Sequence, residues 1–173
     1  MTRSVFAVTL IISSLVLNRL VGQEETDVDI DQREFKQSLI WIIASIGVIA
    51  VMATVIPRFS GFWAITLDTS KELSVTETFL IPRMFGILIA TAEEMFFRGF
   101  ATNLFIARTG TGIGITLSGL FFAAYHFAVY GTNPSLMVFV AGAGIMLSYA
   151  AYRTGRVSTT IIAHTFNNFW AGA

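Results

Sequence analysis

The 173-residue sequence contains no cysteine and little charge. The absence of cysteine excludes disulfide bonds, thiolate metal sites and a cysteine nucleophile. Charged residues make up 13% of the chain and hydrophobic residues 54%, whereas soluble domains are about one quarter charged. Together with a mean hydropathy of +0.71, this composition indicates a protein that is solvated mainly by lipid.

An excess of charge of one sign is also missing. Lysine and arginine total 11 residues, aspartate and glutamate total 11, and the formal net charge is zero. The basic residues are scattered, so the sequence lacks the positive patch that marks nucleic-acid-binding proteins. We therefore expect no nucleic-acid partner. The apolar composition instead predicts that the protein is embedded in a lipid bilayer.

Long apolar runs account for most of the chain. A helix needs about 20 apolar residues to cross a bilayer, and roughly six runs approach that length. These runs cover residues 4–22, 38–57, 79–107, 112–130, 135–152 and 157–171. Because a single chain spans lipid as helices or as a closed barrel, runs of this length predict an all-α, polytopic transmembrane helical bundle.

The N-terminal part of the chain differs from the rest in its loops. Residues 23–37 hold six of the 11 acidic residues and are predicted to form an aqueous loop. Residues 58–76 mix aromatic and charged side chains, as an interfacial segment does. The sequence thus predicts an N-terminal unit, 1–78, and a core, 79–173. The run 4–22 is interpreted as a retained helix, with a cleaved signal peptide as the alternative.

Small residues and basic residues give further expectations for the bundle. The glycines between Thr109 and Gly114 predict a tight turn, and Gly142, Gly144 and Ser148 are small enough for close helix contact. Six basic residues flank alternate loops and predict the cytoplasmic side by the positive-inside rule. They are Arg19, Arg33, Lys36, Arg108, Arg153 and Arg156.

The predicted core, residues 79–173, contains few ionisable residues within its apolar runs. After Glu77 the only acidic residues are Glu93 and Glu94, which are adjacent within an apolar run. The chain has two histidines, His126 and His164, and both lie inside predicted spans. A charged side chain at mid-bilayer costs about 2.5–3.5 kcal/mol on insertion scales. These side chains are therefore expected to face one another or a water-filled cavity.

Helical spacing sorts these residues into faces. Glu94 and Arg98 are four residues apart and share a face, which predicts a structural ion pair, whereas Glu93 points about 100° away. His164 and Asn168 also share a face. A carboxylate beside an imidazole can deprotonate a water, and a second imidazole with a carboxamide can donate to an oxyanion. The pattern therefore favours a hydrolytic site.

Three segments together resemble a known family. They are Glu93-Glu94-Met95-Phe96-Phe97-Arg98-Gly99, Phe122-Ala123-Ala124-Tyr125-His126 and His164-Thr165-Phe166-Asn167-Asn168. In order, they match the patterns EExxxR, FxxxH and HxxxN of the CPBP intramembrane proteases. That family includes the type II CAAX prenyl endopeptidases and bacterial relatives linked to bacteriocin processing and self-immunity. The resemblance covers residues 79–173.

The resemblance implies a function and a site. It implies an endopeptidase that acts on peptides or lipidated proteins, integral to the cell (plasma) membrane of a prokaryote. It assigns catalysis to four polar residues: Glu93, His126, His164 and Asn168. The first two would activate water and the last two would stabilise the tetrahedral intermediate. Glu94 and Arg98 would be supporting residues, and Phe122 is predicted to be a packing residue.

Metal dependence stays open at the level of sequence. Catalytic zinc usually takes three protein ligands and a water, and Glu93, His126 and His164 match that count. No HExxH helix is present in the sequence. The preferred hypothesis is a glutamate mechanism without a cofactor, and a zinc enzyme is the alternative.

Two other classes of protein fit the same residues. In a proton- or cation-coupled transporter component, intramembrane acids and histidines would relay protons or bind a cation. A membrane chaperone or immunity protein would keep the fold without turnover, because fold does not guarantee chemistry. Asn168 favours the protease, since an oxyanion donor has no evident use in a proton relay.

Overall fold

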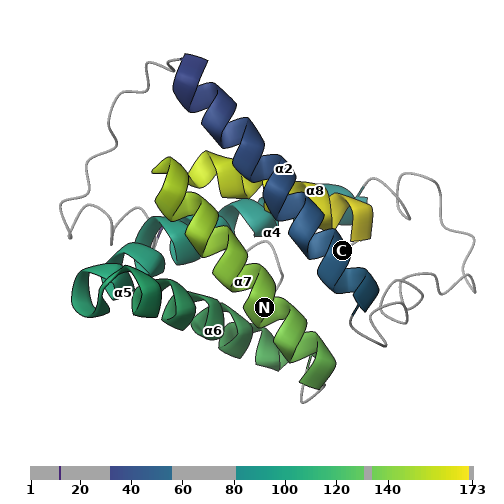
Figure 1. Cartoon of the computed structure of the whole chain (residues 1–173). Coiled ribbons are helices and arrows are strands. Elements are labelled where there is room, and N and C mark those ends of the chain that lie inside the picture. Colours follow the sequence, from purple (N-terminus) through teal and green to yellow (C-terminus); the bar gives the residue numbers. More distant parts are fainter. Residues whose placement is uncertain (1–11, 13–31, 56–80, 131–133, 172–173) are drawn as a thin grey trace, which may run out of the picture.

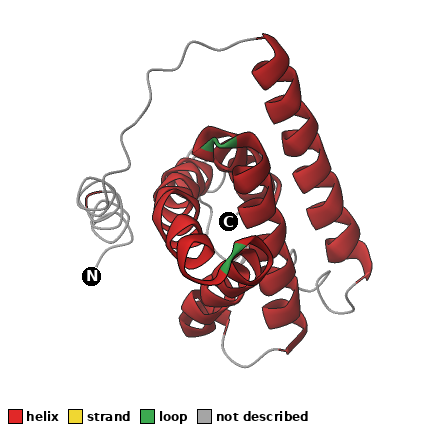
Figure 2. Cartoon of the chain, turned by 60° about the vertical axis from the view of Figure 1, so that its left-hand side comes forward, coloured by secondary structure: helices red, strands yellow, loops and turns green. Residues whose placement is uncertain are grey.

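All regular elements that the structure describes are helices. The structure is a computed structural model, and it describes residues 12, 32–55, 81–130 and 134–171. Figure 2 shows helices joined by short turns in this part of the chain. The elements are α2 (Gln32–Val55), α4 (Ile81–Glu94), the π-helix η2 (Met95–Ala101), α5 (Thr102–Thr109), α6 (Thr111–Tyr130), α7 (Pro134–Thr154) and α8 (Val157–Ala171). The predicted all-α class is confirmed for these residues.

Two of the described helices are long and apolar enough to cross a membrane. They comprise Gln32–Met52 and Pro134–Thr154, each of 21 residues, and Thr111–Phe127 forms a shorter apolar helix. The predicted run 4–22 and the predicted interfacial segment 58–76 lie outside the described residues. The prediction that residues 23–37 form a loop is wrong for its last six residues, because α2 already begins at Gln32. Glu34 in its first turn suits the positive end of the helix dipole.

The predicted turn between Thr109 and Gly114 is narrower than expected. Of the three glycines in this segment, only Gly110 has a positive φ, which is 82°. Thr111 already begins α6. Gly112 and Gly114 are therefore helical, which corrects the prediction. Gly114 serves helix packing instead, because a Cβ atom there would lie 2.5 Å from the backbone nitrogen of Ile106 in α5.

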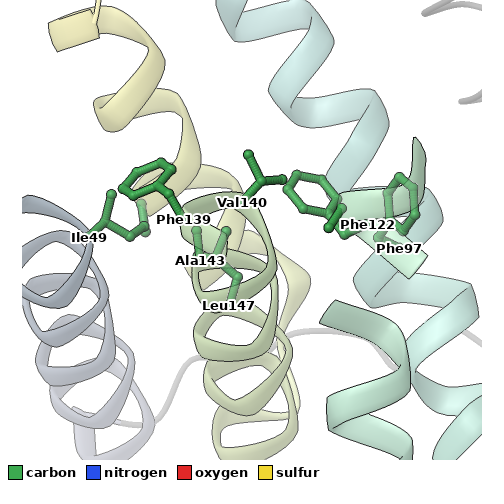
Figure 3. Close-up of a cluster of buried hydrophobic side chains, with 9 residues drawn as sticks. Ile49, Phe97, Phe122, Phe139, Val140, Ala143 and Leu147 are labelled. Atoms are coloured by element: carbon green, nitrogen blue, oxygen red, sulfur yellow. The ribbon is translucent and has the colours of Figure 1, made fainter. Parts of the chain in front are cut away.

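The helices pack around α7. Helix α7 lies between α2 and α6, and α8 packs against both α4 and α2 (Figure 1). The buried hydrophobic cluster runs through this arrangement, from Ile49 on α2 through α7 to Phe122 on α6 and Phe97 on η2 (Figure 3). This cluster holds together the elements that carry the polar motifs.

Small residues let α6 and α7 approach closely, as predicted for Gly144. A Cβ atom at Gly144 would lie 3.0 Å from the Cα atom of Gly119. Ser148, also predicted to permit close contact, is completely buried and hydrogen-bonds through Oγ with Ser118, at 3.1 Å. Ser118 in turn lies 2.7 Å from Thr102 Oγ1, so three hydroxyls link α5, α6 and α7. The predicted close contact is confirmed.

We expect Gly119→Ala to lower the thermal stability of the protein in detergent. A methyl group there would lie 2.6 Å from the backbone nitrogen of Ile145, and overpacking of this kind costs about 1–3 kcal/mol. Gly112→Ala in the same helix is the matched control, because nothing lies within 4 Å of the position that its Cβ atom would take. Equal melting temperatures for the two variants would contradict the assignment of Gly119 to a tight contact.

Polar contacts tie the start of α2 to the turn between α7 and α8. Gln37 donates to the carbonyl oxygen of Arg153 at 3.0 Å, and Arg156 forms an ion pair with Glu34. The guanidinium of Arg153 lies 5.5 Å from the ring centroid of Trp41. These contacts bring Arg153 and Arg156 to the same end of the bundle as the N-terminus of α2, as the distribution of basic residues predicts.

Candidate active site

The two adjacent glutamates stand at a change of helix type. Glu93 and Glu94 end α4, and the next seven residues form the π-helix η2. The carbonyl oxygen of Phe97 accepts both the backbone N–H of Thr102, five residues on, and its hydroxyl, at 2.8 Å. Such π-helical turns are rare and occur frequently at functional sites, because they rotate the side chains that follow.

Glu94 and Arg98 form the ion pair that their spacing predicts. The Nη1 atom of Arg98 donates to Glu94 Oε1 at 2.9 Å, and neither side chain is exposed. The Nη2 atom donates to the carbonyl oxygen of Gly144 at 3.2 Å. A buried charge of this kind needs both its partner and further hydrogen bonds, and α7 supplies one of them.

Glu93 lies between the two histidines. Its Oε2 atom is 3.8 Å from Nε2 of His126, on α6, and 3.9 Å from Nε2 of His164, on α8. All three residues are buried, with at most 9% of each exposed. Three helices that are distant in sequence thus bring one carboxylate and two imidazoles to a single point, as the polarity of the sequence predicts.

The other ring nitrogen of His126 fixes its tautomer. Nδ1 of His126 lies 2.9 Å from the carbonyl oxygen of Phe122, one turn earlier in α6. A carbonyl can only accept, so Nδ1 carries the proton and Nε2 of the neutral ring is an acceptor. Glu93 and His126 therefore present two acceptors to the same space, which is the arrangement that holds and deprotonates a water.

His164 makes a contact that the sequence did not indicate. Its Nδ1 atom lies 2.7 Å from Oε1 of Glu94, the same oxygen that accepts from Arg98. Spacing predicts the partner of Glu94 within its own helix, but His164 is 70 residues away and comes from α8. The two glutamates therefore contact the two nitrogens of one imidazole.

Asn168 hydrogen-bonds to the backbone of α4, in contrast to the other three predicted catalytic residues, whose side chains face one another. It lies one turn beyond His164 on α8, and its amide donates to the carbonyl oxygen of Gly86 at 3.3 Å. Gly86 is two turns before Glu93 in α4. The structure therefore brings Glu93, His126 and His164 together, whereas the Asn168 amide is hydrogen-bonded to the backbone of α4.

Phe122 forms an aromatic surface under the polar residues. Its ring centroid lies 4.3 Å from that of His126 and 5.9 Å from that of His164. The guanidinium of Arg98 lies 4.3 Å from the same centroid, within the range of a cation–π interaction. Phe122 is 3% exposed, so the prediction of a packing residue is confirmed, and its ring also contacts three polar groups.

The predicted zinc ligands do not form a metal site as they stand. Within the part of the chain that the structure describes, no group of three His, Cys, Asp or Glu side chains is arranged to hold a metal ion. The atoms that face one another in Glu93, His126 and His164 are 3.8–3.9 Å apart.

Comparison with known proteins agrees with the three motifs. Residues 75–170, more than half of the chain, match the family described as type II CAAX prenyl endopeptidase Rce1-like. No curated protein and no solved structure shows significant similarity to the chain. Proteins of this family are polytopic membrane proteases, and the apolar helices agree with an integral membrane protein. The predicted resemblance is confirmed, and the chain belongs to the Rce1-like family of type II CAAX prenyl endopeptidases.

Proposed function

We propose that the protein is an intramembrane endopeptidase that hydrolyses peptide bonds with a water activated by Glu93 and His126. The observation that carries this proposal is the position of the Glu93 carboxylate, 3.8 and 3.9 Å from two imidazole nitrogens in a buried site. A general base must lie within hydrogen-bond reach of the proton that it removes, or reach it through one water, and we propose that a water bound by both Glu93 and His126 is the nucleophile.

The reaction follows from the positions of these atoms. The water donates one hydrogen to Glu93 and the other toward Nε2 of His126, and its oxygen attacks the carbonyl carbon of the peptide. Glu93 takes the proton as the carbon–oxygen bond forms. Glu93 then returns the proton to the leaving nitrogen as the carbon–nitrogen bond breaks, so that the carboxylate is regenerated.

His164 and Asn168 are proposed to stabilise the oxyanion. Because Nδ1 of His164 donates to Glu94, its Nε2 atom donates to an oxyanion when the ring carries both protons. The Asn168 amide lies one helical turn away and would turn from Gly86 to the substrate when it binds.

The proposal also covers the class of substrate, the membrane that the protein spans and the roles of the two parts of the chain. Substrates would be prenylated CAAX proteins or other membrane-associated peptides, and the protein would span the plasma membrane of a prokaryote about six times. Residues 79–173 would form the protease core. Residues 1–78 would add the N-terminal spans, of which α2 packs against α7 and α8.

The test is cleavage of defined peptides by the purified full chain in lipid nanodiscs. A prenylated CAAX peptide, its unprenylated counterpart and an unbiased peptide library are each incubated with wild type and with Glu93→Ala. We expect wild type to release fragments that carry one oxygen from labelled water. If the wild-type protein cleaves none of these peptides, the result would favour the transporter component or the non-catalytic chaperone or immunity protein.

Metal analysis separates the two mechanisms. The glutamate mechanism predicts that cleavage is unchanged after exhaustive treatment with chelator, because Glu93 and His126 supply the base. One zinc per active chain, lost in His164→Ala, would overturn this mechanism while leaving the same three residues at the site. Elemental analysis of the purified protein and of this variant provides the measurement.

A further inference from the structure

The structure gives Glu94 a second role besides its ion pair with Arg98. Its Oε1 atom lies 2.9 Å from Nη1 of Arg98 and 2.7 Å from Nδ1 of His164. Both neighbours meet the same oxygen, and Glu94 is completely buried. A buried carboxylate paired with an arginine is ionised, and an ionised carboxylate can only accept. The proton between Glu94 and His164 therefore belongs to Nδ1.

This contact decides which nitrogen of His164 faces the site. With Nδ1 held on Glu94, the ring presents Nε2 to Glu93, at 3.9 Å. The ring also stands nearly perpendicular to that of Phe122, at 78° and with centroids 5.9 Å apart. Hydrogen bonding of the other nitrogen is the usual means by which proteins select a histidine tautomer.

Both histidines hold a proton on Nδ1, but each donates it to a different acceptor. His126 uses the carbonyl oxygen of Phe122, within its own helix. His164 depends on a carboxylate from another helix, 70 residues earlier in the chain. A substitution at Glu94 should therefore release one ring and leave the other in place.

We propose that Glu94 is a positioning residue that holds His164 with Nδ1 protonated and Nε2 directed to the site, while Arg98 keeps Glu94 ionised. The inference deepens the proposed function and rests on it for its catalytic consequence. The arrangement resembles the carboxylate of a serine protease triad, which orients an imidazole without reacting itself.

Nitrogen NMR of the full chain in nanodiscs tests the inference directly. The protein has two histidines, so selective ¹⁵N-histidine labelling yields two rings, and a His126→Gln sample assigns them. We expect the wild-type spectrum to show the proton of His164 on Nδ1. A neutral His164 with its proton on Nε2 would overturn the proposal, and this measurement requires no activity.

The matching variant is Glu94→Met/Arg98→Met. Replacing both members of a buried ion pair by apolar residues avoids an unpaired charge, so the bundle is expected to fold. We expect His164 to shift toward the Nε2-protonated form and His126 to stay unchanged. Turnover should fall by about 10²–10³-fold, with the KM changed little, because a ring that Glu94 no longer holds is not oriented toward the reacting carbonyl in the transition state.

The outcomes separate this inference from the proposed function. An unchanged His164 spectrum in the double variant would refute the positioning role, whatever the activity. A wild-type protein that cleaves nothing but shows the expected spectra would refute the protease and retain the contact between Glu94 and His164. Glu34→Gln is the matched control, because Glu34 also pairs with an arginine but lies at the surface. If the double variant fails to fold, the wild-type spectrum decides.

Discussion

Glu93→Ala is expected to abolish detectable peptide cleavage while the helical bundle stays folded. Glu93 places its carboxylate between both imidazoles, so its loss removes the group proposed to take the proton of the attacking water. Loss of a general base typically lowers turnover by about 10²–10⁴-fold. Cleavage of the substrate peptide, followed by mass spectrometry, measures the effect, and circular dichroism checks the fold.

Two further variants grade the same prediction. His126→Ala should also abolish cleavage, because His126 holds the water together with Glu93. Asn168→Ala should leave a trace, since loss of one oxyanion donor costs about 10²–10³-fold in turnover. Glu34→Gln, at an exposed ion pair, should retain wild-type cleavage. A Glu93→Ala protein that cleaves at the wild-type rate would refute the proposed mechanism.

The largest effect on stability is expected from Arg98→Ala. Arg98 is 1% exposed, and its guanidinium neutralises Glu94, donates to Gly144 and covers the ring of Phe122. Its loss leaves Glu94 without its counter-charge in a low-dielectric interior, which costs roughly 3–5 kcal/mol. Folded yield and melting temperature should both fall, as measured by size-exclusion chromatography and thermal unfolding in detergent.

The two glutamates should differ in the same assay. Glu94→Gln is expected to behave like Arg98→Ala, because it leaves the guanidinium without its counter-charge. Glu93→Gln should fold at nearly wild-type yield, since no arginine pairs with Glu93 in the described site. Equal melting temperatures for Glu93→Gln and Glu94→Gln would show that the division into a catalytic and a structural carboxylate is wrong.

This division has a physical origin in the backbone. Glu93 and Glu94 are neighbours, yet one contacts two imidazoles through Oε2 and the other contacts Arg98 and His164 through Oε1. Successive helical residues point about 100° apart, so Glu93 faces His126 and Glu94 faces Arg98, while His164 lies between the two carboxylates. Each carboxylate of the buried site thus has its own set of contacts.

Patterns local to one helix could be predicted from the sequence. The ion pair between Glu94 and Arg98 follows from a spacing of four residues, and the apolar runs 112–130, 135–152 and 157–171 predicted α6, α7 and α8 close to their observed bounds. The meeting of Glu93 with both histidines was predicted because isolated ionisable groups are costly in lipid. The roles assigned to these residues and to Asn168 stay predictions.

Features that depend on how helices pack were not predicted. The sequence contains no sign of the π-helix at Met95–Ala101, because its hydrogen bonds differ from those of an α-helix by a single residue. Nor does it indicate that Thr102, Ser118 and Ser148 meet. The turn at Gly110 was predicted too wide, since glycines also mark close helix contacts.

The sequence by itself determined that this protein is helical and apolar, that it belongs to a family of membrane proteases, and which polar residues must compensate one another. Hydropathy and a period of 3.6 residues carry that information along each helix. Only the tertiary structure decided that His164 contacts both glutamates and that Asn168 reaches Gly86. Those contacts depend on the rotation and separation of whole helices, which close approach at residues such as Gly119 and Gly144 sets.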